Sequence, residues 1–128
     1  MNGNLMDTNV IVRILNNDTE LIDQLSEIGS LCTRSIVLGE LLYGAAKSLR
    51  TEQNRNAAIS FCSCYPLYTV TDSVADVYGS IKHSLLSHGH VLPENDIWIA
   101  ATALANDMAI VTQDKHFDFI PNLKVIKA

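Results

Sequence analysis

The sequence predicts an α/β fold, a three-layer α/β/α sandwich with a central parallel sheet. Short apolar segments alternate with longer segments whose apolar residues repeat at helical spacing, which is the pattern of a parallel sheet covered by helices on both faces. The chain has 128 residues, 48% of them hydrophobic, which is enough to bury a core without disulfides or metal staples. We therefore expect residues 1–128 to form a single domain.

The N-terminal quarter of the chain indicates two strands and two helices. A short buried strand ends at Met6, and a helix over 8–15 follows, because its apolar residues recur at helical spacing. A second helix, over 19–29, has one apolar face and ends at Gly29, which we expect to stop it in a left-handed conformation. Residues 30–33 fit a second buried strand.

The next segment indicates two helices and a strand. Residues 35–49 are strongly apolar at helical spacing, with Ser35 as the expected N-cap. Residues 51–65 form a polar-faced helix, closed by Pro66, and the β-branched and aromatic residues of 67–70 favour a strand.

The C-terminal half repeats the alternation of helices and strands. A helix over 71–89 carries one apolar stripe and ends at Gly89. Residues 95–107 are rich in alanine and leucine, so this helix can approach the sheet closely. Two strands complete the sheet, over 108–112 and, after a turn-rich link, 123–127.

Composition excludes several classes of protein. The formal net charge is −5, which argues against a protein that coats nucleic acid by bulk charge, so any polyanion must meet a local basic patch or metal ions. Cys32, Cys62 and Cys64 have no zinc-like spacing, which favours reduced thiols. No signal peptide and no apolar run of about 18 residues is present, so we expect a soluble, cytoplasmic protein with no membrane contact.

Four acidic residues occupy related positions in this pattern. Asp7 and Asp114 follow predicted strands, whereas Glu40 and Asp96 lie near the starts of predicted helices. Each alone has an ordinary explanation as a helix cap, a turn residue or an exposed charge. Jointly, however, these positions converge on the carboxyl edge of an open α/β sheet, where ligands bind.

Carboxylates gathered at one edge favour a metal ion. Four such groups repel one another by several kcal/mol in order-of-magnitude terms unless cations lie between them. Oxygen ligands of this kind suit hard divalent ions, so the sequence predicts Mg²⁺ or Mn²⁺ as the cofactor.

Four segments also resemble a known family. "LMDTNVIV", "SIVLGELLYGA", "ENDIWIAATALA" and "IVTQDKHF" occur in the order and spacing of PIN-domain ribonucleases, and "ELLYG" with "NDIWIAA" is most similar to the VapC-type toxins of prokaryotic toxin–antitoxin pairs. The resemblance covers nearly the whole chain. It implies the PIN-like α/β/α sandwich, a homodimer, and a small antitoxin whose C-terminal segment covers the active-site groove.

The resemblance also assigns roles to individual residues. The catalytic and metal-binding acids would be Asp7, Glu40, Asp96 and Asp114. The residues that support them without being the main ligands would be Asn9, Thr112 and, with a less defined role, Glu94. The expected chemistry is hydrolysis of RNA phosphodiester bonds by metal-activated water.

Basic residues near the acids are candidates for RNA contact. They are Arg13, Lys47, Arg50 and Lys115. For each of them, a solubilising surface charge is an equally good explanation. The histidines are not spaced as a metal pair, so we expect surface or loop positions for His83, His88, His90 and His116.

Three other classes of protein fit the sequence less well. A PIN scaffold that only binds RNA or protein would have the same fold, although retention of all four acids argues for an enzyme. Phosphatases of the haloacid-dehalogenase type use an aspartate nucleophile in Asp-x-Asp, but Asn9 occupies the third position here. A phosphoacceptor receiver domain needs an early acidic pair, which "MNGNL" does not contain.

Overall fold

The computed structural model describes residues 3–128, which contain a sheet of five parallel strands in the order β3-β2-β1-β4-β5. The strands are β1 (Asn4–Met6), β2 (Leu31–Arg34), β3 (Leu67–Tyr68), β4 (Ala109–Thr112) and β5 (Val125–Lys127). β1 is central, and it pairs with β2 on one side and with β4 on the other. The predicted parallel sheet is therefore confirmed.

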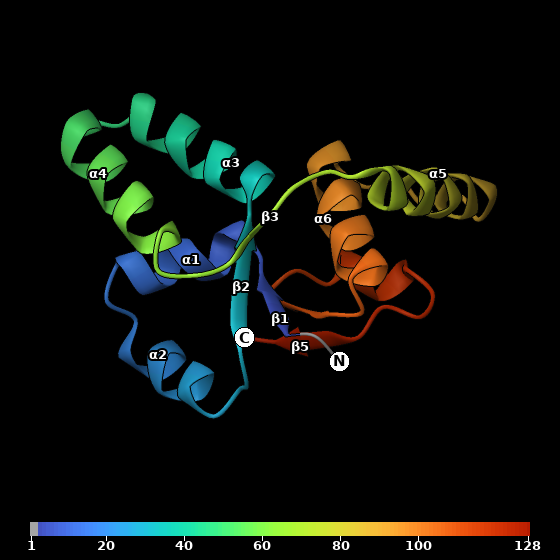
Figure 1. Cartoon of the computed structure of the whole chain (residues 1–128), viewed down its shortest axis with the longest axis horizontal. Coiled ribbons are helices and arrows are strands. Elements are labelled where there is room, and N and C mark those ends of the chain that lie inside the picture. The colour runs from blue at the N-terminus through green and yellow to red at the C-terminus, as the bar shows by residue number, and fades with distance from the viewer. Residues whose placement is uncertain (1–2) are drawn as a thin grey trace.

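Helices cover both faces of this sheet. They are α1 (Thr8–Leu15), α2 (Thr19–Ser26), α3 (Ser35–Ala46), α4 (Thr51–Cys62), α5 (Asp72–Ser87) and α6 (Glu94–Ala105), and a short 3-10 helix spans His116–Phe119. Figure 1 shows α1 to α4 on one side of the strands and α5 with α6 on the other. The three-layer α/β/α sandwich expected from the sequence is confirmed.

The core lies between the central strands and the helices against them. All four residues of β4 are buried, as are Leu5 and Met6 of β1. α6 contacts both β4 and α5, and its alanines at 100, 101 and 103 have no exposed surface. Small side chains let this helix fit between the sheet and α5, as its composition predicted. No helix within residues 3–128 has the length and apolar character that crossing a membrane requires.

Two predicted helix signals are wrong, and one is confirmed. α2 ends at Ser26, and Gly29 does not adopt a positive φ. Ser35 is the first residue of α3, so the N-cap position falls to Arg34, which makes no side-chain capping hydrogen bond. Gly89, by contrast, has φ +77° after the end of α5.

Arg34 is the largest fully buried side chain among the described residues. Its three guanidinium nitrogens have no hydrogen-bond partner within residues 3–128. Burial lowers the pKa of Arg34 to about 10, an effect that the negative charge of Glu40 partly opposes. A buried charge without hydrogen bonds costs stability, because it loses its hydration without replacement.

Replacing this arginine should therefore stabilise the protein. We expect Arg34→Met to raise the free energy of unfolding by about 1–3 kcal/mol, because an apolar side chain of similar length fills the same space without the desolvated charge. Urea denaturation measures the difference. Arg55→Met, at an exposed position on α4, is the matched control and should change the free energy by less than about 0.5 kcal/mol. A loss of stability in Arg34→Met would show that the guanidinium makes favourable contacts.

Candidate active site

The candidate site lies at β1, where the chain stops adding strands on one side of the sheet and starts adding them on the other. The chain leaves central β1 for β2 on one side, while β4 pairs on the other side, so a crevice opens at the carboxyl ends of β1 and β4. Asp7 follows β1 directly, and Asp114 lies two residues beyond β4. The Asp7 N–H donates to the Val111 carbonyl oxygen over 2.9 Å, which joins the two strand ends.

Asp7 is held by three hydrogen bonds. It is the N-cap of α1, and its Oδ1 accepts from the Thr8 N–H at 2.8 Å. Its Oδ2 accepts from the Thr112 hydroxyl at 2.7 Å and from Asn9 Nδ2 at 3.2 Å. The residue is only 3% exposed. The aspartate therefore both caps the helix and presents a fixed carboxylate at the strand end.

Asn9 and Thr112 link Asp7 to Asp114. Asn9 Nδ2 also donates to Asp114 Oδ2 over 2.9 Å, and the Asp114 N–H donates to the Thr112 hydroxyl over 3.0 Å. The other amide atom of Asn9, Oδ1, is buried and has no hydrogen-bond partner among the described residues. Asn9 and Thr112, two of the residues expected to support the acids, thus each contact both Asp7 and Asp114.

Glu40 reaches the same region from α3. It lies in the second turn of that helix, and its Oε1 accepts from the Thr8 hydroxyl at 2.9 Å. The Thr8 hydroxyl thereby ties the start of α1 to Glu40, while its N–H donates to the capping carboxylate of Asp7. Thr8 was not among the predicted site residues, although it directly follows Asp7 and therefore has its hydroxyl close to the strand end.

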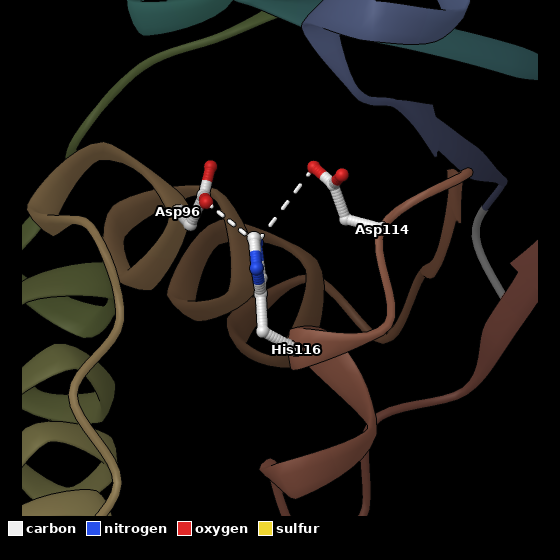
Figure 2. Close-up of side chains that lie close together, drawn as sticks. All are labelled: Asp96, Asp114 and His116. Carbon is white, nitrogen blue, oxygen red and sulfur yellow. Dashed lines mark ion pairs between the residues drawn. The ribbon is translucent and has the colours of Figure 1, made fainter.

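His116 lies between Asp96 on one side and Asp114 on the other, as Figure 2 shows. Asp96 is in the first turn of α6, and His116 begins the 3-10 helix. His116 Nε2 is 2.7 Å from Asp96 Oδ2 and 3.7 Å from Asp114 Oδ2. One ligand atom from each of these three residues lies within 4.8 Å of the others, which is the spacing of groups that can share a metal ion.

The four predicted acids line one cavity of about 610 Å³. Its lining also includes Thr8, Asn9, Pro93, Glu94, Asn95 and His116. A second groove of about 330 Å³ lies among α1, α3 and α4 and shares Thr8 and Glu40 with this cavity. The rest of its lining is largely apolar and includes Val12, Leu15, Leu41, Ala57 and Ala58. An acidic cavity and an apolar groove therefore adjoin at Glu40.

Burial and mutual repulsion disfavour negative charge on two of the acids. Burial raises the pKa of Asp7 to about 6, although the hydrogen bonds from Thr112 and Thr8 oppose this shift. Burial likewise raises the pKa of Asp96, with His116 opposing the rise and Glu40 and Asp114 adding to it. A cation among these groups relieves both effects. The oxygen-rich ligand set, with one imidazole nitrogen, thus fits a divalent metal ion.

Glu94 lines the cavity but has different partners from the four acids. Its carboxylate receives a hydrogen bond from the Tyr78 hydroxyl and forms an ion pair of 2.5 Å with Lys82 Nζ. Lys82 and Tyr78 lower the pKa of Glu94. The side chain therefore joins α6 to α5.

The four candidate RNA-contacting cations differ in position. Lys47 lines a hollow that adjoins the cavity and includes Glu40, and its Nζ lies 4.9 Å from the centre of the Tyr43 ring. Arg13 Nε is engaged by Asp18 at 2.9 Å, and Arg13 Nη1 donates to Gln113. The remaining two, Arg50 and Lys115, are exposed. Lys47 thus lines the same hollow as Glu40.

His116 is the principal site residue that the sequence analysis missed. It was expected at a surface or loop position, because it lacks a histidine partner in sequence. Instead, Asp96, which lies twenty residues earlier, supplies its partner. The available signal was the spacing in "TQDKHF", which puts His116 two residues after Asp114.

Known proteins resemble this chain in sequence and in fold. The PIN domain family model matches residues 5–123. Ribonuclease VapC2 of Rickettsia felis is 32% identical over 93% of this chain and 92% of its own length. Two crystal structures superpose closely, VapBC2 from Rickettsia felis bound to a promoter DNA fragment (29% identity, TM-score 0.89) and DNA-bound VapBC from Salmonella typhimurium (28% identity, TM-score 0.90). Each match covers at least 98% of both chains.

Proposed function

The chain belongs to the PIN-domain family, and on this premise we propose that it is a divalent-metal-dependent endoribonuclease and the toxin of a type II toxin–antitoxin pair. The observation that carries the proposal is the cavity at the ends of β1 and β4, where acids from four separate segments meet. The ribonuclease name of the R. felis relative and the two VapBC structures that superpose closely support it.

We assign the metal ligands to Asp7, Glu40, Asp96 and Asp114. Asn9 and Thr112 hold Asp7 and Asp114 at a fixed separation, and the Thr8 hydroxyl anchors Glu40 by a hydrogen bond. A bound Mg²⁺ or Mn²⁺ would supply the positive charge that activates water and offsets the charge developing on the phosphodiester. Because the ligands are anchored before metal arrives, little reorganisation is needed at the moment of reaction.

An acidic protein needs cations to approach RNA. With a net charge of −5, this chain attracts the phosphate backbone only locally. Lys47, in the hollow beside Glu40, is the best-placed side chain for a phosphate that flanks the cut. Metal ions in the cavity would supply the remaining positive charge.

The apolar groove suits the antitoxin. It lies among α1, α3 and α4 and opens onto Glu40, so an apolar segment bound there would end against the acids. In this arrangement the partner would block the access of both metal and RNA to the acids.

We further propose a cytoplasmic homodimer, following the family resemblance. Light scattering of the purified protein measures its mass.

The other classes considered are less well supported. In an aspartate-nucleophile phosphatase the residue two after the nucleophile would be a second acid, whereas Asn9 donates hydrogen bonds to both Asp7 and Asp114. A scaffold without catalysis has no need for four converging carboxylates whose charges oppose one another.

Metal removal tests the proposed function. We expect purified protein to cleave labelled total RNA with Mg²⁺ or Mn²⁺, to lose this cleavage in excess chelator, and to regain it when the metal is restored, because the acids need a cation to act together. Gel analysis of the RNA is the measurement. Cleavage that persists in chelator would contradict metal-dependent chemistry. As a second readout, added metal should raise the melting temperature, since an ion that binds only the folded state stabilises it.

A further inference from the structure

The imidazole of His116 faces two of the proposed metal ligands. Its Nε2 lies 2.7 Å from Asp96 Oδ2 and 3.7 Å from Asp114 Oδ2, and the three side chains converge on one point in Figure 2. Within residues 3–128, no other group of three histidine, cysteine or acidic side chains brings its ligand atoms so close together. The nitrogen is therefore placed where an ion shared by the two aspartates would lie.

The partners of this nitrogen are themselves proposed metal ligands. His116 Nε2 has almost no surface exposed to solvent, and within residues 3–128 it faces the Asp96 carboxylate at 2.7 Å and that of Asp114 at 3.7 Å. Buried polar atoms in folded proteins are nearly always hydrogen-bonded or bound to an ion or water. A divalent ion shared by the three side chains would satisfy the nitrogen and both carboxylates together, because one ligand atom from each already lies within 4.8 Å of the others.

The backbone around His116 fixes the position of the ring. The next residue, Phe117, is fully buried, and its ring lies 5.0 Å from the imidazole, centre to centre. Lys127 Nζ donates to the carbonyl oxygen of Asp114 over 2.9 Å and thus ties the loop to β5. A ligand held in this way loses little conformational freedom when an ion binds.

We propose that His116 Nε2 is a direct metal ligand beside Asp96 and Asp114, and that the centre consequently binds Mn²⁺ in preference to Mg²⁺. The proposal rests on the metal-dependent function above and adds a nitrogen to an otherwise all-oxygen ligand set. Mg²⁺ is a hard ion that prefers oxygen ligands and keeps its waters, whereas a first-row transition ion accepts imidazole readily.

Two variants separate ligation from simple ion pairing. In His116→Gln the carboxamide can still donate a hydrogen bond to Asp96, but it offers no imidazole nitrogen. The matched control is His90→Gln, because His90 is also half-buried and its ring stacks on Phe119 with centres 4.0 Å apart, outside the acidic cavity. A structural role of His116 would be largely kept by glutamine, whereas a ligand role would be lost.

Pulsed electron paramagnetic resonance of the Mn²⁺-loaded protein gives the decisive readout. We expect a hyperfine coupling to a directly bound nitrogen in the wild type and in His90→Gln, altered by ¹⁵N-histidine labelling and absent in His116→Gln. The Mn²⁺ dissociation constant should rise about tenfold or more in His116→Gln, since even residues that only support a ligand often account for 10-fold to 100-fold in affinity. The Mg²⁺ constant should change less than about threefold.

The outcomes also distinguish this inference from the proposed function. If the wild type binds Mn²⁺ and cuts RNA but shows no nitrogen coupling, or if His116→Gln retains the coupling, His116 is not a ligand and the ribonuclease proposal stands. If the wild type neither binds Mn²⁺ nor cuts RNA with any divalent ion, the proposed function fails, and this inference fails with it.

Discussion

Asp96→Asn should reduce RNA cleavage at least about a hundredfold while leaving the fold as stable as the wild type or slightly more so. The loss follows because the amide removes one of the charged oxygens proposed to position the metal ion. Stability should not suffer, since burial and neighbouring carboxylates already disfavour the charge on Asp96 in the metal-free protein. We expect the change in free energy of unfolding to stay within about 1 kcal/mol.

A helix-start aspartate outside the cavity serves as the matched control. Asp72 lies in the first turn of α5, as Asp96 does in α6, and Asp72→Asn should leave cleavage near the wild-type rate. Melting curves with and without Mg²⁺ add a second comparison, because the wild type should gain more from metal than Asp96→Asn does. Wild-type cleavage by Asp96→Asn would remove this residue from the site.

The second large effect concerns Asp7 and pH. The pKa of Asp7 is about 6 in the folded protein, against an ordinary value of 3.8 for the unfolded chain. Between these values the folded state holds the proton more tightly, so the Asp7 contribution to stability is present below about pH 4 and is lost as the pH rises to 6. The difference between these two pKa values corresponds to about 3 kcal/mol in the free energy of unfolding. Metal-free protein should therefore lose stability over this range.

Comparison with Asp7→Asn isolates the contribution of this one group. In chelator, urea denaturation between pH 4 and 7 should show a wild-type stability that declines relative to the variant by up to about 3 kcal/mol. Asparagine also caps helices, so the loss of the cap is small. Saturating Mg²⁺ or Mn²⁺ should abolish or reverse the trend, since a bound cation favours the carboxylate. A pH-independent difference in chelator would show that folding leaves the pKa of Asp7 near its ordinary value.

Sequence reasoning located the strands and helices because their signals are local. Apolar spacing placed α1 at the residues expected, and Gly89 ended α5 through its own positive φ. Ser35 was mistaken for a helix cap because capping depends on the backbone conformation of the preceding residue, Arg34, which the strand β2 fixes. Nothing in the local sequence marks Arg34 as buried.

Within the candidate site, the positions of the acids could be predicted from the sequence. The residues that contact them could be predicted only in part. Strand ends converge in any parallel sheet, so Asp7 and Asp114 followed from topology. His116 and Glu94 did not, because the direction of a side chain depends on contacts with distant elements. The Glu94 carboxylate turns to Lys82 on α5, and His116 meets Asp96 across the crevice.

The pairing of β1 with β4 also governs when the protein can act during its own synthesis. Asn4 of the central strand aligns with Ala109, so this contact forms only after more than a hundred residues that separate the two have been made. Such distant pairings form late and slowly. While β4 is still inside the ribosome tunnel, Asp114 and Thr112 cannot reach Asp7. The Asp7 side chain then has no fixed orientation. Translation itself therefore delays assembly of the candidate active site until β4 has emerged from the ribosome.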